Sequence, residues 1–243
     1  MASLVGHTSD VWSIAIDGDR LVSGGGDQTI KLWDLSVLSK NEASDKTLQP
    51  MLSIFVSNDN EWVMWSEKGY FTSSASGDKY VGYHINQGSN KEARYVSSDK
   101  YFDTLFRPDI IAAIWQTGSE EKAIAYANRT KKVKAVNIAV SLPPVVSLLS
   151  QSNINTSTNT IEVEFSISSS EALEEIIILH NGERLDTRGL KRKKNNSNSG
   201  QKTDHVTITL TSGENIVSIK ARNKFAMSDE VLVYATQTTN IQD

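Results

Sequence analysis

Alternating apolar and polar positions predict short strands near the start of the chain. The two-residue period of a β-strand runs through residues 11–15 and again through residues 29–32. Gly18 and the run Gly-Gly-Gly-Asp at residues 24–27 interrupt the alternation, as residues of tight turns do. The pattern therefore predicts an antiparallel sheet of short strands joined by tight turns.

The same stretch opens with Gly-His and closes with Trp-Asp, and these dipeptides resemble the ends of a WD40 repeat, one blade of a β-propeller. In that family a His, a Ser or Thr, an Asp in a tight turn and a Trp form a buried hydrogen-bonded chain. The resemblance assigns a structural tetrad to His7, Ser23, Asp27 and Trp33. A catalytic Ser-His-Asp interpretation is disfavoured, because this hydroxyl would belong to a buried strand residue.

A second, weaker unit follows at residues 51–86. Its segment GDKYVGYHIN parallels GDQTIKLWDL of the first unit, with Asp78 in the place of Asp27. His84 stands where the first unit has Trp33, so the tetrad is degenerate, which is typical of a terminal blade. Two blades do not close a ring of roughly four to eight. We therefore expect either a piece of a longer protein or a propeller completed by another chain.

Apolar residues then recur at helical spacing and predict three short helices that pack on the last blade. Ser98 is the expected cap of the first helix, and Pro108 occupies the first position of the second. Gly118 ends the second helix, and Ser119 caps the third.

Beyond Pro143-Pro144 the pattern is that of a β-sandwich. Residues 161–167 alternate strictly, residues 206–210 and 217–221 alternate again, and Asn181-Gly182 is a two-residue hairpin turn. About seven short strands without a Cys-Trp-Cys core predict a disulfide-free, immunoglobulin-like sandwich.

These patterns predict a mainly β chain: a partial WD40 propeller of about two blades, a helical connector and the sandwich. All five tryptophans lie at or before residue 115, which supports a boundary between the parts. The expected domains are the blades at 1–90 (1–49 regular, 50–90 degenerate), the connector at 91–141 and the sandwich at 142–238.

Composition narrows the function further. The 243 residues include no Cys, and 25 Lys and Arg against 29 Asp and Glu give a net charge of −4. The acidity disfavours a dedicated nucleic-acid binder. The four histidines are widely spaced, so no metal site is expected. No P-loop or GxGxxG motif is present in the sequence, and no cofactor is expected. Neither a signal peptide nor a membrane span is apparent, and we expect a cytoplasmic protein that is not an enzyme.

Longer stretches resemble bacterial WD40-repeat proteins that carry a C-terminal caspase-like peptidase domain. The resemblance rests on EWVMWSEKGYFTSSASGDKYVGYHIN, YFDTLFRPDIIAAIW, PPVVSLLS and GENIVSIKARNKFAMSD. It implies the order propeller, helical segment, Ig-like sandwich and peptidase. The peptidase domain is absent from this sequence, so no catalytic residue is carried over.

Three functional hypotheses remain open. The first is a non-catalytic interaction or scaffold module whose partners are other proteins or the missing blades of its own propeller. The second is the regulatory portion of a caspase-like cysteine peptidase whose catalytic domain lies outside this chain. The third is anion or nucleic-acid binding through the basic loop 188–204, at Lys191, Arg192, Lys193 and Lys194.

Overall fold

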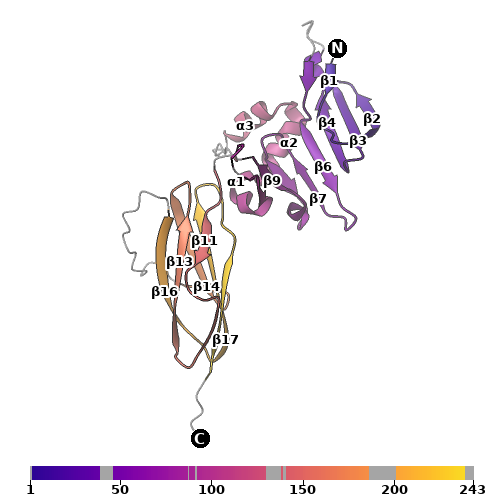
Figure 1. The fold of residues 1–243 in the computed structure, drawn as a ribbon. Coiled ribbons are helices and arrows are strands. Elements are labelled where there is room, and N and C mark those ends of the chain that lie inside the picture. Colours follow the sequence, from indigo (N-terminus) through magenta and orange to yellow (C-terminus); the bar gives the residue numbers. More distant parts are fainter. Residues whose placement is uncertain are drawn as a thin grey trace. The chain divides into compact units, whose positions relative to one another are not determined.

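The computed structural model shows a mainly β chain whose contacts divide it into two units, Met1–Ala135 and Val136–Asp243 (Figure 1). The structure describes residues 2–38, 46–86, 88–90, 92–129, 138, 141–185 and 201–238. The first unit is a partial propeller with short helices, and the second is a β-sandwich. The mainly β fold class expected from the sequence is confirmed.

The first unit is built on one antiparallel six-stranded sheet. Its strands, in spatial order, are β2 (Val11–Asp17), β3 (Arg20–Gly25), β4 (Thr29–Asp34), β6 (Leu52–Val56), β7 (Trp62–Trp65) and β8 (Phe71–Ser73). The two stretches expected as successive blades are joined in this sheet, because β4 pairs with β6 from Thr29–Phe55 to Leu32–Leu52. This pairing satisfies the outer backbone edge of β4, which would otherwise be open.

The second half of the unit does not repeat the first. Asp78 lies in the 3-10 helix η2 (Gly77–Tyr80), and His84 lies in β9 (Gly82–Ile85). Strand β9 pairs with β10 (Arg94–Ser97) rather than with the six-stranded sheet. A separate parallel pair joins β1 (Ala2–Leu4) to β5 (Lys46–Leu48), and a short 3-10 turn, η1 (Ser36–Leu38), follows β4.

The expected helices are present in the first unit: η3 (Ser98–Tyr101) runs into α1 (Phe102–Leu105), followed by α2 (Pro108–Thr117) and α3 (Glu120–Ala127). Gly118 ends α2 in the left-handed region at φ 68°, and the Ser119 hydroxyl accepts from the Lys122 N–H, as predicted. Ser98 is not the predicted cap: its hydroxyl donates to the Asp78 carbonyl, which ties η3 to η2.

The second unit consists of two facing sheets. One has the order β11 (Val145–Leu148), β13 (Thr160–Ser168), β16 (Gln201–Thr209). The other has the order β12 (Asn153–Thr156), β18 (Val231–Gln237), β17 (Gly213–Asn223), β14 (Leu173–His180), β15 (Glu183–Arg184). Strand β12 is an addition to those the sequence pattern predicted.

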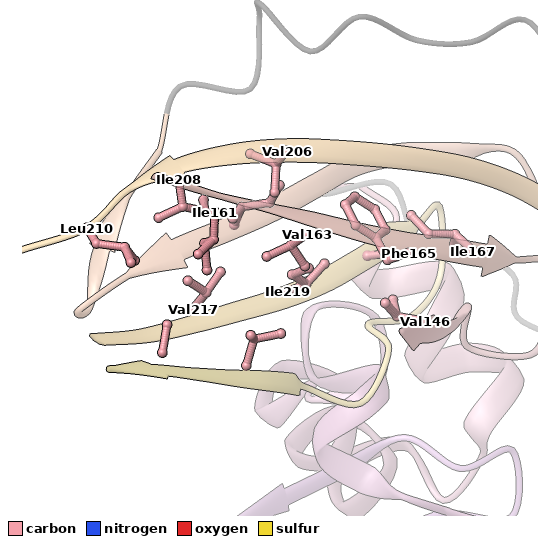
Figure 2. Close-up of a cluster of buried hydrophobic side chains, with 14 residues drawn as sticks. Val146, Ile161, Val163, Phe165, Ile167, Val206, Ile208, Leu210, Val217 and Ile219 are labelled. Carbon is pink, nitrogen blue, oxygen red and sulfur yellow. The ribbon is translucent and has the colours of Figure 1, made fainter. Parts of the chain in front are cut away.

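Apolar side chains at alternate positions of the strands fill the core of the sandwich. Ile161, Val163, Phe165 and Ile167 of β13 are buried, and their polar neighbours at 162 and 164 are exposed. Figure 2 shows these side chains facing Val217 and Ile219 of β17 across the space between the sheets. The two-residue turn predicted at Asn181-Gly182 is confirmed, because His180 pairs with Glu183 and both turn residues have positive φ, 51° and 84°.

Candidate functional site

The four residues predicted as a tetrad come together in the first blade. The Trp33 indole Nε1–H donates to Ser23 Oγ at 2.8 Å, and Ser23 Oγ lies 2.8 Å from His7 Nε2. His7 Nδ1 lies 2.9 Å from Asp27 Oδ2 and 3.0 Å from Oδ1. The structure therefore links the turn after β3, strands β3 and β4 and the segment before β2 by one chain of hydrogen bonds.

One assignment of protons satisfies every member of this chain. Ser23 Oγ accepts from Trp33, so its single hydrogen is available to His7 Nε2. The neutral imidazole then carries its proton on Nδ1 and donates it to the Asp27 carboxylate. Ser23 is 4% exposed and Trp33 is 2% exposed, so the hydroxyl is bonded on two sides and covered from solvent.

Asp27 receives more hydrogen bonds than the tetrad alone provides. The Thr29 hydroxyl and N–H donate to Oδ1 at 2.7 and 3.1 Å, and the Thr8 N–H donates to Oδ2 at 3.0 Å. Burial by itself raises the pKa of Asp27, but the bonds from Thr29, Thr8 and His7 outweigh it and hold the pKa well below its usual range. The carboxylate is therefore ionised and fully partnered.

Sequence reasoning missed Thr8 and Thr29. The available signal was the segment Asp27-Gln28-Thr29, because an Asp that accepts from the residue two positions on is a common tight-turn arrangement. Gln28 has φ 62°, which confirms a sharp turn at this point. Hydrogen bonds from Thr29, in the same turn, thus orient the Asp27 side chain independently of His7.

The glycines around the tetrad leave room for its rings. A Cβ on Gly25 would lie 2.7 Å from His7 Nδ1, and a Cβ on Gly6 would lie 3.1 Å from Trp33 Cη2. Neither contact fits a side chain without displacing a ring. Gly25 and Gly6 are therefore required by close packing against His7 and Trp33.

Lys31 is a buried cation on the same sheet, and the sequence pattern did not single it out. It lies opposite Ser23 in the strand register, and its Nζ donates to Ser53 Oγ at 3.1 Å. Burial lowers the pKa of Lys31, while the negative charge of Asp27 opposes that shift. The contact with Ser53 helps to join β4 to β6.

Strand β2 carries the three most exposed large apolar side chains of the six-stranded sheet, Trp12, Ile14 and Ile16. Its large apolar side chains are open to solvent: Val11 is 51% exposed, Trp12 75%, Ile14 63% and Ile16 60%. Ile14 lies opposite the buried Ser23, whereas Val22 and Ile30, at 36% and 41%, belong to the other face. Apolar surface is thus exposed on both faces at this end of the sheet.

Metal ligands, membrane crossing and the basic loop can each be checked against the described part of the chain. No group of three or more His, Asp or Glu that could hold a metal ion is found there. None of the helices in the described ranges is long and apolar enough to cross a membrane. The predicted basic loop positions, Lys191, Arg192, Lys193 and Lys194, lie outside the described residues.

Comparisons with known proteins give two curated relatives. Protein HIRA of Dictyostelium discoideum is 36% identical over 75 residues, 28% of this chain and 7% of that protein. Protein HIRA of Oryza sativa subsp. japonica is 27% identical over 93 residues, 37% of this chain and 10% of that protein. The chain thus spans a tenth or less of these relatives, which are eukaryotic. The bacterial caspase-like resemblance remains an expectation.

Among solved structures, the fibronectin(III)-like modules of Clostridium thermocellum CbhA match with a TM-score of 0.31 and 16% identity, over 46% of this chain and 52% of that one. The family described as "WD domain, G-beta repeat" matches residues 1–34. All four tetrad residues lie inside this match. The first 34 residues are therefore a WD40 repeat.

Proposed function

We propose that this chain is a non-catalytic protein-interaction module in which the tetrad clamps a WD40 blade and the β2 end of the blade is the contact surface. The WD40 match supports an interaction or scaffold role in general. Such blades present their surfaces on a rigid frame, as binding sites require. The partner is another protein or further blades of the same propeller, because both supply a complementary sheet or apolar surface.

One observation carries the proposal. Ile14 and Ile16 are more than half exposed on one face, while Val22 and Ile30 are exposed on the other. An antiparallel sheet normally buries one face and presents polar residues on the other. Exposed apolar residues on both faces are the pattern of an element that packs between two neighbours, and clustered exposed apolar surface marks interaction sites.

The tetrad supports a structural role rather than hydrolysis. The order Ser23–His7–Asp27 has the connectivity of a hydrolytic triad, in which the hydroxyl must reach a substrate. Here Ser23 Oγ already accepts a hydrogen bond from the Trp33 N–H, and the serine side chain is buried, so it does not reach a substrate. A blade fixed at His7 and Trp33 holds β2 in position, so the clamp serves the contact surface.

Site-specific photo-crosslinking in the cells that express the protein tests this function. A benzophenone amino acid replaces Trp12, and a control replaces Glu174, an exposed residue of β14 in the sandwich. We expect a discrete adduct with one polypeptide from position 12 only. Adding Ile14→Asp and Ile16→Asp should remove the adduct. Equal labelling from both positions, or an adduct that survives both aspartates, would overturn the proposal.

A further inference from the structure

The larger sheet of the sandwich turns apolar side chains outward as well as inward. Val217 and Ile219 of β17 belong to the buried core, so Ser218 between them points to the outer face. The register places Leu179 of β14 and Leu232 of β18 beside Ser218, on the same outer face. An antiparallel sheet with one solvated face normally carries polar residues there. The composition of this face is therefore unusual for one that meets only water.

Two further apolar side chains on this face are open to solvent. Ile216 of β17 is 46% exposed, and Tyr234 of β18, its partner in the register, is 48% exposed. Ser218 is only 6% exposed, and among the described residues its hydroxyl has no hydrogen-bond partner. Larger neighbouring side chains therefore shield this hydroxyl from water. We call Leu179, Ile216, Leu232 and Tyr234 the outer apolar group.

The smaller sheet of the sandwich provides an internal comparison. Strand β13 presents Glu162 and Glu164 on its outer face, and β16 places Thr207 and His205 opposite them. These four positions are polar, as expected of a solvated face. Val145 of β11 is exposed on this sheet as a single apolar residue, which is ordinary for a protein surface. A cluster such as the outer apolar group instead marks a contact surface.

Charges of opposite sign lie at the two ends of the outer face along β17. Glu214 lies at one end and is exposed, and Lys220 and Arg222 lie toward the other end. Lys220 Nζ is 3.5 Å from a Glu230 oxygen, and an Arg222 nitrogen is 3.1 Å from a Glu175 oxygen. The side chains of both cations stay about one third exposed, at 33% and 37%. Their charges are therefore still accessible from the outer face.

This order of charges fits a second copy of the same face. Two copies that stack face to face with antiparallel β17 strands bring Glu214 of each copy over the basic end of the other. The outer apolar group lies between the two ends, so it meets itself at the twofold axis and each contact occurs twice. Parallel β17 strands would oppose Glu214 to Glu214 and Lys220 to Lys220. The charges therefore select the antiparallel arrangement.

The size of the face indicates a weak association. From Glu214 to Arg222 the face is about 27 Å long, and the five strands make it about 19 Å wide. The resulting area, roughly 500 Å², is smaller than the roughly 800 Å² that each partner contributes to a standard stable interface. We therefore expect copies that pair in concentrated solution and separate on dilution.

We propose that the outer face of the five-stranded sheet is a self-association surface, through which two copies of this chain pack sheet on sheet with antiparallel β17 strands. The outer apolar group supplies the buried contact, and the pairing of Glu214 with the basic end sets the direction. The packing has the face-to-face geometry that joins the two sheets within a sandwich. The surface belongs to the second unit, so the inference goes beyond the proposed function, which concerns the first unit.

Sedimentation equilibrium of the whole chain tests this inference, over concentrations from about 1 to about 500 μM. We expect a monomer–dimer equilibrium. Ile216→Lys with Tyr234→Lys should weaken dimerisation at least tenfold, and the fold should survive because both side chains are half exposed. Val145→Lys, on the other sheet, is the matched control and should dimerise as the native chain does. A monomer at every concentration would overturn the proposal, as would equal effects of the control and the double variant.

A charge exchange tests the direction of packing. Glu214→Lys should weaken dimerisation at least tenfold, because it places a cation over the basic end of the other copy. Adding Lys220→Glu and Glu230→Lys reverses the opposing charge while keeping an ion pair within each copy, so the triple variant should regain dimerisation. A triple variant as weak as Glu214→Lys alone, or a Glu214→Lys chain that dimerises normally, would overturn the antiparallel arrangement.

Discussion

The indole N–H of Trp33 donates to Ser23 Oγ at 2.8 Å, so the hydroxyl that bonds to His7 is also held by Trp33. Strand β4 supplies the tryptophan, and strand β3 supplies the serine. The bond therefore ties two neighbouring strands through their side chains, beside the backbone ladder that already joins them. Substitutions that disturb these hydrogen bonds should therefore lower the unfolding free energy of the first unit.

Gly25→Ala should destabilise the first unit, whereas Gly24→Ala should change it little. A Cβ at Gly25 meets His7 Nδ1 at 2.7 Å, while a Cβ at Gly24 meets only Ser13 Oγ at 3.3 Å. We expect a loss of about 1–3 kcal/mol for Gly25→Ala from overpacking, measured by urea unfolding. All five tryptophans lie in the first unit, so their fluorescence reports it. Equal effects of the two neighbouring substitutions would contradict the close packing around His7.

The Asp27 carboxylate should make the first unit sensitive to acid. Its folded pKa lies below the ordinary value of about 3.9, so its contribution is complete above that value and is lost as pH falls through the folded pKa. We expect the unfolding free energy to decline below about pH 5. The Asp27→Asn variant should be less stable at pH 7 and show a flatter decline. Parallel curves for the two proteins would show that Asp27 does not contribute.

Asn223 should be important for the sandwich. Its Oδ1 accepts from the N–H groups of Phe225 and Ala226 at 2.9 Å, and its Nδ2 donates to the Leu142 carbonyl at 2.9 Å. Asn223→Ala removes these bonds and a longer one to Ser169 Oγ at a buried position. We expect a loss of about 2–4 kcal/mol in unfolding free energy, measured by circular dichroism during urea unfolding. Asn153→Ala, at an exposed position of β12, is the matched control. Similar losses for both would contradict the assignment.

A fragment of residues 142–238 should fold by itself. The buried cluster of the sandwich, from Val146 to Ala235, draws every member from this range. A domain with its own core is expected to fold independently. The fragment should show strand-rich circular dichroism and one cooperative thermal transition, with little change from the transition of the same unit in the whole chain. A non-cooperative transition would place part of the domain outside these bounds.

The sequence predicted those features that depend on local periodicity or on single residues. The alternation of β13, the positive-φ turn at Asn181-Gly182 and the end of α2 at Gly118 each follow from the chemistry of a few neighbouring residues. The tetrad was found through the Gly-His and Trp-Asp dipeptides, whose family resemblance carries long-range spacing that periodicity lacks.

Features that depend on long-range pairing were not predictable in this way. The junction of β4 with β6 joins strands that the pattern separated into two blades, and alternation does not name a strand's partner. Exposed sheet faces follow from a propeller of only two blades, but the pattern did not single out Ile14 and Ile16, because an alternating strand has the same pattern whether or not its apolar face is covered. Lys31 was missed because its burial depends on β6, which is distant in the sequence.

The central claim, that the tetrad is a structural clamp in a non-catalytic module, is tested most directly by labelling Ser23 with a fluorophosphonate. The native chain and Ser23→Ala are incubated with the probe, adducts are located by peptide mass spectrometry, and the unfolding free energies are compared. We predict an unlabelled Ser23 and a Ser23→Ala variant less stable by about 1–3 kcal/mol. Stoichiometric labelling of Ser23 in the folded chain, with unchanged stability of the variant, would contradict the account.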